Sequence, residues 1–421
     1  MKHKLIIGYD LGEHTSQISF WHTKEKEPET ASTVAGEEQY NFPTILCRRT
    51  ETNQWVYGKE AVKLSEEGGG IAVEGLPRLA WEGGEVTVGE DTYDPVALLA
   101  LFMKRSLSLL GAAFPLSRID AFVITVPRTD RRMIEALTRA VAAMELKAER
   151  IYVRSHVECF YHYAVHQPPE LLRGQALACD YEEDTLRTYR LEWNRRTHPV
   201  VAFAEEKEYP QMRPKDDMLL SVLKENCENR IVSAVYLLGR GFEGDWYQEC
   251  LRYLCRNRRV FRGNNLYSKG ACYCAGEELL PDDVGKQYVF LGGDKLKANI
   301  GMKALRRGQD SYYALLDAGT NWYEAEKTCE FYLETDNSFS VTVTPLNRKE
   351  SKEIEVILSG LQKRGDRATK VRLSISMQSE NEAALTIEDL GFGEIYPATN
   401  KVWRETFTIE PNDRMPRTGS G

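Results

Sequence analysis

The sequence lacks several features that would assign it to a common class of protein. No apolar run approaches the length of a membrane-spanning helix, and the run Leu5–Gly8 is too short for a secretory signal. Basic residues are not in excess, because 55 Lys and Arg stand against 63 Asp and Glu and give a formal charge of -8. An acidic chain is a poor partner for phosphate backbones. We therefore expect a cytoplasmic protein that binds neither membranes nor nucleic acid.

The sequence also lacks a P-loop and a nucleophile elbow. Its nine cysteines are odd in number and scattered, which favours free thiols over a disulfide framework. Cys250, Cys255, Cys272 and Cys274 come nearest to a metal pattern, but no His flanks them and their neighbours are apolar. We predict that these cysteines are buried and that the chain has no metal site.

Histidine is scarce, with seven residues in all. Three of them, His156, His162 and His166, fall near a common face of a predicted helix among aromatic residues. A functional role is one interpretation, but the aromatic neighbours favour packing.

What is present is a mixed pattern of strands and helices that occurs twice. Residues 5–12 read as a buried strand that ends in Asp and Gly, residues 17–21 as its returning partner, and residues 121–127 as a later apolar strand. After that strand, Asp130 can cap a helix. The second occurrence comprises strands at 177–180, 186–193 and 234–238 with a helix at 218–230.

The composition changes between Gly276 and Gly293, where we place a domain boundary. Beyond it, period-two alternation predicts strands within a β-sandwich at 339–343, 353–357, 371–376 and 383–387. We expect a first domain at residues 1–285, a second at 294–410 and a disordered tail at 411–421.

Taken in order, these segments resemble the 70-kDa heat shock protein family of chaperones. The matching segments are Ile7–Gly12, Phe42–Leu46, Val56–Ala61, Val123–Pro127, Ala178–Asp180 with Thr185, Leu237–Gly241 and Ser268–Ala271. In the β-rich part they are Glu334–Pro345, Leu358–Leu361 with Arg364, and Leu385–Gly393. The resemblance covers roughly residues 4–410.

The resemblance implies an α/β actin-like ATPase (ribonuclease H-like) body, duplicated, followed by an all-β sandwich. It implies a nucleotide cleft lined by Asp10, Gly12, Thr15, Asp180, Thr185, Gly239 and Gly241. It also implies that the sandwich holds an extended peptide at Leu296, Ile300 and Met302, although strand residues of a sandwich are more often core.

Several residues depart from the family's pattern. Glu13 and His14 replace small hydroxyl residues at the tip of the first phosphate hairpin, and Tyr181–Asp184 replaces a glycine run in the second. Pro77 stands where the family has a catalytic lysine, with Arg78 beside it. Only about 50 residues separate the second hairpin from the adenosine loop, too few for the lobe that covers the adenine.

Two sets of arginines have more than one interpretation. Arg154 reverses the charge of a family position, and an ordinary surface residue is as good an interpretation as a lost relay of nucleotide state. For Arg252, Arg256, Arg258, Arg259 and Arg262, the sequence favours a solvated helix face over a binding patch.

The sequence therefore predicts a non-catalytic scaffold or protein- and peptide-binding protein, a pseudo-ATPase with no catalytic residue and no cofactor, whose partner binds the β-sandwich. One alternative is a weak chaperone ATPase that binds ATP and Mg²⁺ despite the altered loops. A second is an actin-like assembly subunit.

Overall fold

The computed structural model describes residues 4–34, 36–111, 119–263, 265–281, 283–306, 308–334, 337–346, 350–365 and 367–409. The chain divides into two compact units between Gly292 and Gly293. The first unit extends beyond residue 285 because β17 (Tyr288–Phe290) pairs with β14 (Val200–Tyr209). The tail expected at 411–421 lies outside the described residues, as do Thr335 and Asp336 of the family-like segments.

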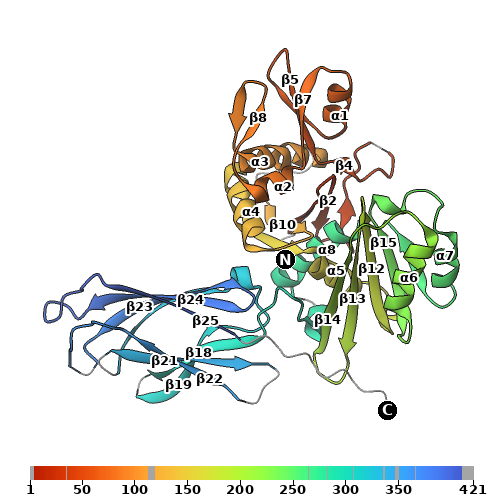
Figure 1. The fold of residues 1–421 in the computed structure, drawn as a ribbon. Helices are drawn as coiled ribbons and strands as arrows, with labels where there is room; N and C mark the ends of the chain where they lie inside the picture. Colours follow the sequence, from red (N-terminus) through yellow and green to blue (C-terminus); the bar gives the residue numbers. More distant parts are fainter. Residues whose placement is uncertain are drawn as a thin grey trace. The chain divides into compact units, whose positions relative to one another are not determined.

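The first unit is a mixed α/β body with two large sheets (Figure 1). The first sheet has the order β11-β10-β1-β2-β3, and β4 also pairs with β2. Its strands are β1 (Leu5–Leu11), β2 (Thr15–His22), β3 (Glu29–Thr30), β4 (Phe42–Pro43), β10 (Ile119–Val126) and β11 (Ala148–Ser155). β1 runs antiparallel to β2 and parallel to β10.

The second large sheet has the order β16-β15-β12-β13-β14-β17. Its remaining strands are β12 (Gln175–Glu182), β13 (Thr185–Asn194), β15 (Val232–Leu238) and β16 (Arg259–Arg262). β12 runs antiparallel to β13 and parallel to β15. Each sheet therefore has a hairpin at its centre, with the first strand of the hairpin beside a parallel strand that comes later in the chain.

Helices cover both faces of both sheets, which explains why the central strands are apolar on both sides. α2 (Leu76–Glu82), α3 (Pro95–Ser106) and α4 (Arg131–Met144) share a core with one face of the first sheet. α5 (His156–Val165) and α8 (Leu266–Leu279) pack between the two sheets, and α6 (Asp216–Cys227) and α7 (Gln248–Leu254) cover the outer face of the second sheet. Asp130 caps α4 as the sequence predicted, since its side chain accepts a hydrogen bond from the Met133 backbone.

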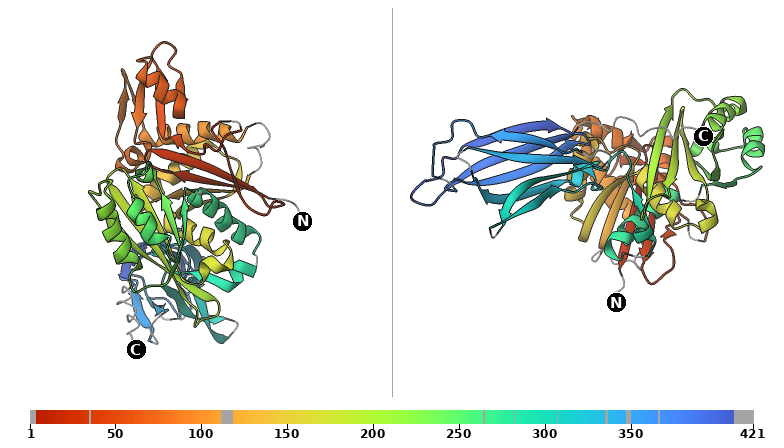
Figure 2. Two further views of the ribbon diagram at one scale, coloured as in Figure 1. Left: turned by 90° about the vertical axis from the view of Figure 1, so that its right-hand side faces the viewer. Right: turned by 90° about the horizontal axis from the view of Figure 1, so that it is seen from below.

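A smaller region is inserted between the central hairpin of the first sheet and α3. It contains β5 (Ile45–Arg49), β6 (Trp55–Tyr57), α1 (Gly58–Glu66), β7 (Gly70–Glu74), β8 (Val86–Val88) and β9 (Asp91–Tyr93). Figure 2 shows that the β5–β7 sheet projects from the rest of the first unit. The second half of the unit has only β14 and α6 between β13 and β15.

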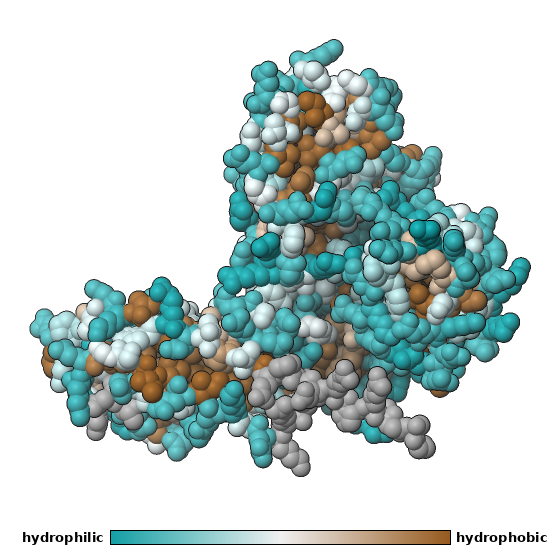
Figure 3. All heavy atoms as spheres, viewed as in Figure 1, coloured by the Kyte–Doolittle hydropathy of each residue, from teal (hydrophilic) through white to brown (hydrophobic). Residues whose placement is uncertain are grey.

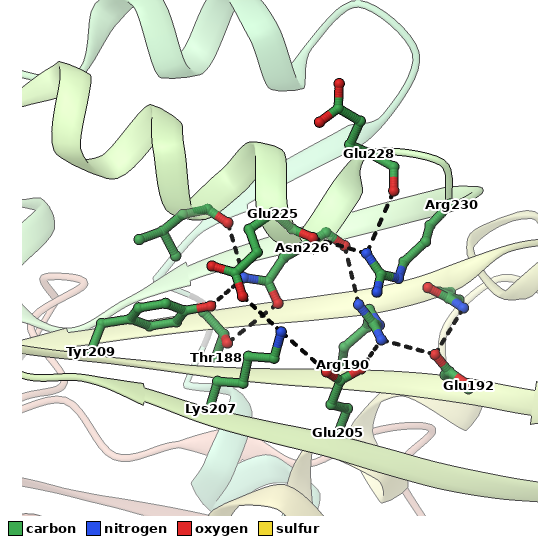
Figure 4. A network of polar contacts seen from close by, with 12 residues as sticks. Thr188, Arg190, Glu192, Glu205, Lys207, Tyr209, Glu225, Asn226, Glu228 and Arg230 are labelled. Carbon is green, nitrogen blue, oxygen red and sulfur yellow. Dashed lines mark hydrogen bonds and ion pairs between the residues drawn. The ribbon is translucent and has the colours of Figure 1, made fainter. Parts of the chain in front are cut away.

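A buried polar network joins α6 to the second sheet (Figure 4). Arg190 on β13 is 2% exposed and binds the carboxylates of Glu192 and Glu205. α6 ends at Cys227, three residues before the predicted end, because Arg230 turns back and donates to the backbone oxygens of Glu225 and Glu228.

The structure excludes one of the two interpretations of Arg154 and contradicts the helix face predicted for the other arginines. Arg154 is not a surface residue, because it is 2% exposed and its guanidinium lies 2.7 Å from Glu278 and 3.6 Å from Glu158. The five arginines do not form a helix face. Only Arg252 lies on α7, and Arg259 and Arg262 lie on β16. α7 ends at Leu254, so no single helix carries the five side chains.

The second unit is an all-β region with two four-stranded antiparallel sheets around one apolar core. One sheet has the order β19-β18-β21-β22 and the other β20-β23-β24-β25. The strands are β18 (Ala298–Arg306), β19 (Gln309–Leu316), β20 (Glu326–Tyr332), β21 (Ser338–Pro345), β22 (Lys352–Ile357), β23 (Lys370–Ser379), β24 (Glu382–Gly391) and β25 (Val402–Thr408). The four strands expected from period-two alternation fall within β21 to β24.

No helix in the described part of the chain combines the length and the apolar character that crossing a membrane requires. A short helix, α9 (Asp283–Gln287), precedes β17 at the end of the first unit.

Candidate functional site

A cleft of about 400 Å³ opens in the first unit where β1 and β12 end. Strands that run parallel direct their carboxyl ends to the same edge of a sheet, which is where α/β proteins commonly bind ligands. Of the residues expected at a nucleotide, this cleft is lined by Asp10, Gly12, Thr15, Asp180, Thr185 and Gly239. The structure thus brings together the two hairpins and the later glycine loop.

Gly241 is the one expected cleft residue that does not line the cleft. A Cβ atom at this position would lie 2.3 Å from the ring of Tyr181. Gly239 has a φ of +89°, and a Cβ there would lie 2.3 Å from the Tyr181 backbone oxygen. Contacts within the protein therefore explain both glycines without a ligand.

His156 lies between the two aspartates of the cleft. Its Nε2 atom is 2.8 Å from Oδ1 of Asp10, and its Nδ1 atom is 3.7 Å from Oδ2 of Asp180. The first contact is a hydrogen bond, and the second is an ion-pair distance. Tyr267 on α8 donates a hydrogen bond of 3.0 Å to the same Asp180 oxygen. One histidine therefore bridges the first strands of the two sheets.

The charge of His156 follows from these contacts. Burial alone would lower the pKa of the imidazole, but Asp10 and Asp180 more than offset this effect and raise the pKa to about 9. The side chain is consequently an imidazolium at neutral pH, and it supplies a fixed positive charge between two carboxylates.

Acidic side chains at the hairpin tips also lie beside basic side chains of the protein itself. Nε2 of His14 lies 2.8 Å from Glu183 and so joins the tip of the first hairpin to that of the second. Arg240 lies 3.5 Å from Glu182, whose pKa is raised by burial and by Asp180. Arg78 lies 3.4 Å from Glu13, whose pKa burial raises as well. Several carboxylates of the cleft are therefore paired with basic side chains of the protein itself.

Sequence reasoning missed His156 as a cleft residue because it was grouped with His162 and His166 on one helix. A signal was present. His156 directly follows β11, and Asp10 and Asp180 likewise stand near the carboxyl ends of their strands. Position at the end of a strand therefore identifies the residues of this cleft better than spacing along a helix does.

The second unit has a groove of about 770 Å³ lined by residues of β18, β20 and β21. Of the residues expected to hold peptide, Met302 lines this groove, whereas Leu296 and Ile300 are completely buried in the core. The groove is aromatic: Tyr332 and Phe392 are 53% and 40% exposed, and their ring centroids are 5.9 Å apart. Figure 3 shows apolar side chains gathered in a patch along the visible face of the second unit.

Two known families match the chain. Residues 27–293 match a family of unknown function described as DUF5716, C-terminal, and residues 295–409 match a domain of unknown function, DUF8552. The first match covers well over half of the chain, and the two matches meet next to the division between the units. A search among curated proteins finds no match.

Proposed function

We propose that this chain, which belongs to the DUF5716 C-terminal family, is a non-catalytic scaffold related to the 70-kDa heat shock chaperones. Its first unit is an actin-like body that no longer works as an ATPase, and its second unit binds an extended segment of another protein.

The duplicated sheets support the actin-like part of the proposal. In each sheet, the hairpin has a third antiparallel strand on one side and two parallel strands on the other. The strand orders are β3-β2-β1-β10-β11 in the first sheet and β14-β13-β12-β15-β16 in the second. Asp10 and Asp180 occupy equivalent places on the first strand of each hairpin. A duplicated hairpin that faces a common cleft is the arrangement that phosphate binding needs in this superfamily.

The observation that carries the non-catalytic assignment is the position of His156. Mg²⁺ prefers oxygen ligands, and the two aspartates would supply them. An imidazolium 2.8 Å from Asp10 already balances one of the two negative charges. At the effective dielectric of a protein surface, the imidazolium repels a second cation at about 4 Å by about 4 kcal/mol per unit of charge, which offsets part of the attraction of the carboxylates. The protein has thus replaced the metal of an ATPase by a side chain.

The second half of the body supports the same assignment. Only β14 and α6 stand between β13 and β15, whereas the first half carries an additional small sheet at the equivalent place. An adenine would therefore have protein on one side and solvent on the other. Binding energy for a nucleotide depends on such enclosure.

The alternative, a weak ATPase, is favoured by one observation: six of the seven expected nucleotide residues do line an open cleft. Calorimetric titration of the full chain with Mg-ATP up to millimolar concentration separates the two functions. We expect no heat and no change in melting temperature. A rise of several degrees in melting temperature would show binding to the folded state and would overturn the pseudo-ATPase assignment.

The aromatic groove of the second unit supports the binding function. Apolar side chains of an extended peptide can pack against Tyr332, Phe331 and Phe392, while Lys303 and Glu334 at the rim offer polar contacts. The partner is therefore expected to present aliphatic or aromatic side chains in an unfolded stretch.

This binding function can be tested with short fluorescent peptides that carry central Leu or Phe residues. We expect Tyr332→Ser to weaken binding at least fivefold by removing an aromatic contact. Tyr312→Ser is the matched control, because Tyr312 is 52% exposed but does not line the groove. Equal loss in both variants, or no binding by the unaltered chain, would contradict the assignment.

A further inference from the structure

A second cluster of potential ligands lies away from the cleft, at the contact between α5 and α8. Glu158 and His162 are one helical turn apart on α5, and Cys274 faces them from α8. One carboxylate oxygen, one imidazole nitrogen and the Sγ atom all lie within 4.8 Å of one another. The three residues are 1%, 8% and 2% exposed.

The imidazole of His162 is oriented in a way that suits a metal ligand. Nδ1 lies 3.0 Å from Oε1 of Glu277, and Nε2 lies 4.0 Å from Oε1 of Glu158. A proton on Nδ1, donated to Glu277, leaves the lone pair of Nε2 facing the cluster. Histidines that bind metals commonly have such a carboxylate partner, which fixes both the tautomer and the orientation of the ring.

The charges around the cluster also favour a cation. Two carboxylates, those of Glu158 and Glu277, flank the cluster, and Arg154 lies 3.6 Å from Glu158. Glu278, 2.7 Å from Arg154, is 39% exposed and is therefore screened by solvent. A buried excess of negative charge is costly unless a proton or a metal ion balances it. A divalent cation together with a Cys274 thiolate would bring the group close to neutrality.

The helices that carry these residues are packed against each other between the two large sheets (Figure 1). Gly270 on α8 permits this close approach, since a Cβ there would lie 2.0 Å from the backbone oxygen of Cys159. A metal bound here would therefore link two helices at the centre of the first unit, and the burial of the cluster excludes a large substrate.

We propose that Glu158, His162 and Cys274 bind one Zn²⁺ ion that links α5 to α8. A thiolate, an imidazole and a carboxylate together form a ligand set that zinc prefers. Zinc bonds of ~2.0–2.3 Å require ligand atoms roughly 3.3–3.7 Å apart, so the side chains close inward by about 1 Å through rotation. Binding displaces the proton of the Cys274 thiol to solvent.

The test uses the purified full chain and the metal alone. We expect one equivalent of zinc per chain after dialysis against micromolar free Zn²⁺, and an absorption band from thiolate-to-cobalt charge transfer when Co²⁺ replaces zinc. The absence of bound zinc, or the binding of cobalt without that band, would contradict the proposal whatever the results with the variants.

Variants then assign the ligands. Cys274→Ala should abolish the cobalt band, whereas Cys272→Ala should retain it, because Cys272 is buried on the same helix but lies against Gly8 of β1. Glu277→Gln should weaken zinc binding ~10–100-fold while leaving the band, since Glu277 positions His162 and is not itself a ligand. Equal zinc content in Cys274→Ala and Cys272→Ala would contradict the assigned site.

Should Cys274→Ala fold poorly, the melting temperature of the unaltered chain supplies a second measurement. Ligand binding to the folded state raises this temperature with increasing zinc concentration. We expect the rise in the unaltered chain and in Cys272→Ala, and its absence in both would overturn the proposal.

Discussion

The ring of Tyr267 lies flat on the imidazole of His156, with centroids 3.7 Å apart and planes 12° from parallel. The hydroxyl of the same tyrosine donates to Asp180. Tyr267 therefore contacts both the imidazolium of His156 and the carboxylate of Asp180. Packing as well as charge fixes the ion pairs of the cleft.

Removing the imidazolium should create a site for a divalent cation. The side chains of Asp10 and Asp180 are 15% and 10% exposed in the unaltered chain, and in His156→Ala they would face each other without the cation between them. We expect the variant to be less stable than the unaltered chain, and millimolar Mg²⁺ to raise its melting temperature by several degrees. Differential scanning calorimetry measures both effects.

The control is the double variant His156→Ala with Asp10→Asn, in which one carboxylate is also neutralised. It should respond to Mg²⁺ no more than the unaltered chain does. A magnesium response of equal size in the single and double variants would show that the ion binds elsewhere.

Stability should fall with rising pH because of His156. Its pKa rises from about 6.5 in the unfolded chain to about 9 in the folded chain, where Asp10, Asp180 and Tyr267 surround the ring. A raised pKa means that the folded state binds the extra proton, so the stabilisation is complete below pH ~6.5 and is lost as pH rises through ~9. The loss amounts to roughly 2–4 kcal/mol.

Urea unfolding from pH 6 to pH 9.5 checks this prediction, with His156→Gln as the reference. Ionisation of thiols and tyrosines affects both proteins alike, so the difference between them isolates the imidazole. A difference that stays constant across the range would contradict the assigned charge.

In the second unit, Asp389→Asn should be strongly destabilising. Arg364 donates to both oxygens of Asp389 at 2.7 Å, and the two side chains are 1% and 0% exposed. Burial alone would raise the pKa of Asp389, but Arg364, Thr399 and the Gly391 backbone hold it well below its usual value. Leaving the guanidinium buried without its partner costs about 3–5 kcal/mol of unfolding free energy.

Chemical denaturation of Asp389→Asn measures this loss, and Glu330→Gln serves as its control. Glu330 also binds two cations, Lys370 and Arg372, but on the surface, where solvent screens the interaction. We expect the control to unfold nearly as the unaltered chain does. The unaltered second unit should also lose stability as pH falls below about 4, since the carboxylate must then take up a proton.

Gly270→Ala should destabilise the first unit, although alanine is ordinarily the better helix former by about 1 kcal/mol. The new Cβ would lie 2.0 Å from the Cys159 backbone oxygen, so α5 and α8 would have to separate. Overpacking of this kind costs about 1–3 kcal/mol or more. In contrast, Gly285→Ala on α9 meets no atom closer than 3.4 Å and should be neutral or slightly stabilising. Thermal melts of the two variants compare them directly.

Much of the local structure could be predicted from the sequence. Apolar runs with Asp and Gly at their ends predicted both hairpins, Asp130 predicted the start of α4, and alternation predicted four strands of the second unit. These signals are local, because they depend on residues within one element. Element ends were harder to predict: α6 ends at Cys227, where Arg230 turns back and donates to the Glu225 carbonyl, a contact that spacing does not encode.

The candidate site was predicted only in part. Asp10 and Asp180 were identified from their hairpins, but the histidine between them was not, because its two partners are 146 and 24 residues away in the sequence. The burial of Arg154 was missed for the same reason, since Glu278 reaches it from a helix 124 residues later.

The sequence by itself determined which segments become strands and helices and that two acidic hairpins recur. It also determined that Glu13, His14 and the run Tyr181–Asp184 occupy the hairpin tips, where the resemblance would place small hydroxyls and glycines. Only the tertiary structure decided which basic side chains lie beside the carboxylates of the cleft. Charge pairing acts over a few ångströms between residues that are distant in the chain, so it depends on how β1, β12, α5 and α8 pack together. That packing sets the imidazolium of His156 between Asp10 and Asp180, and it brings Cys274 to Glu158 and His162.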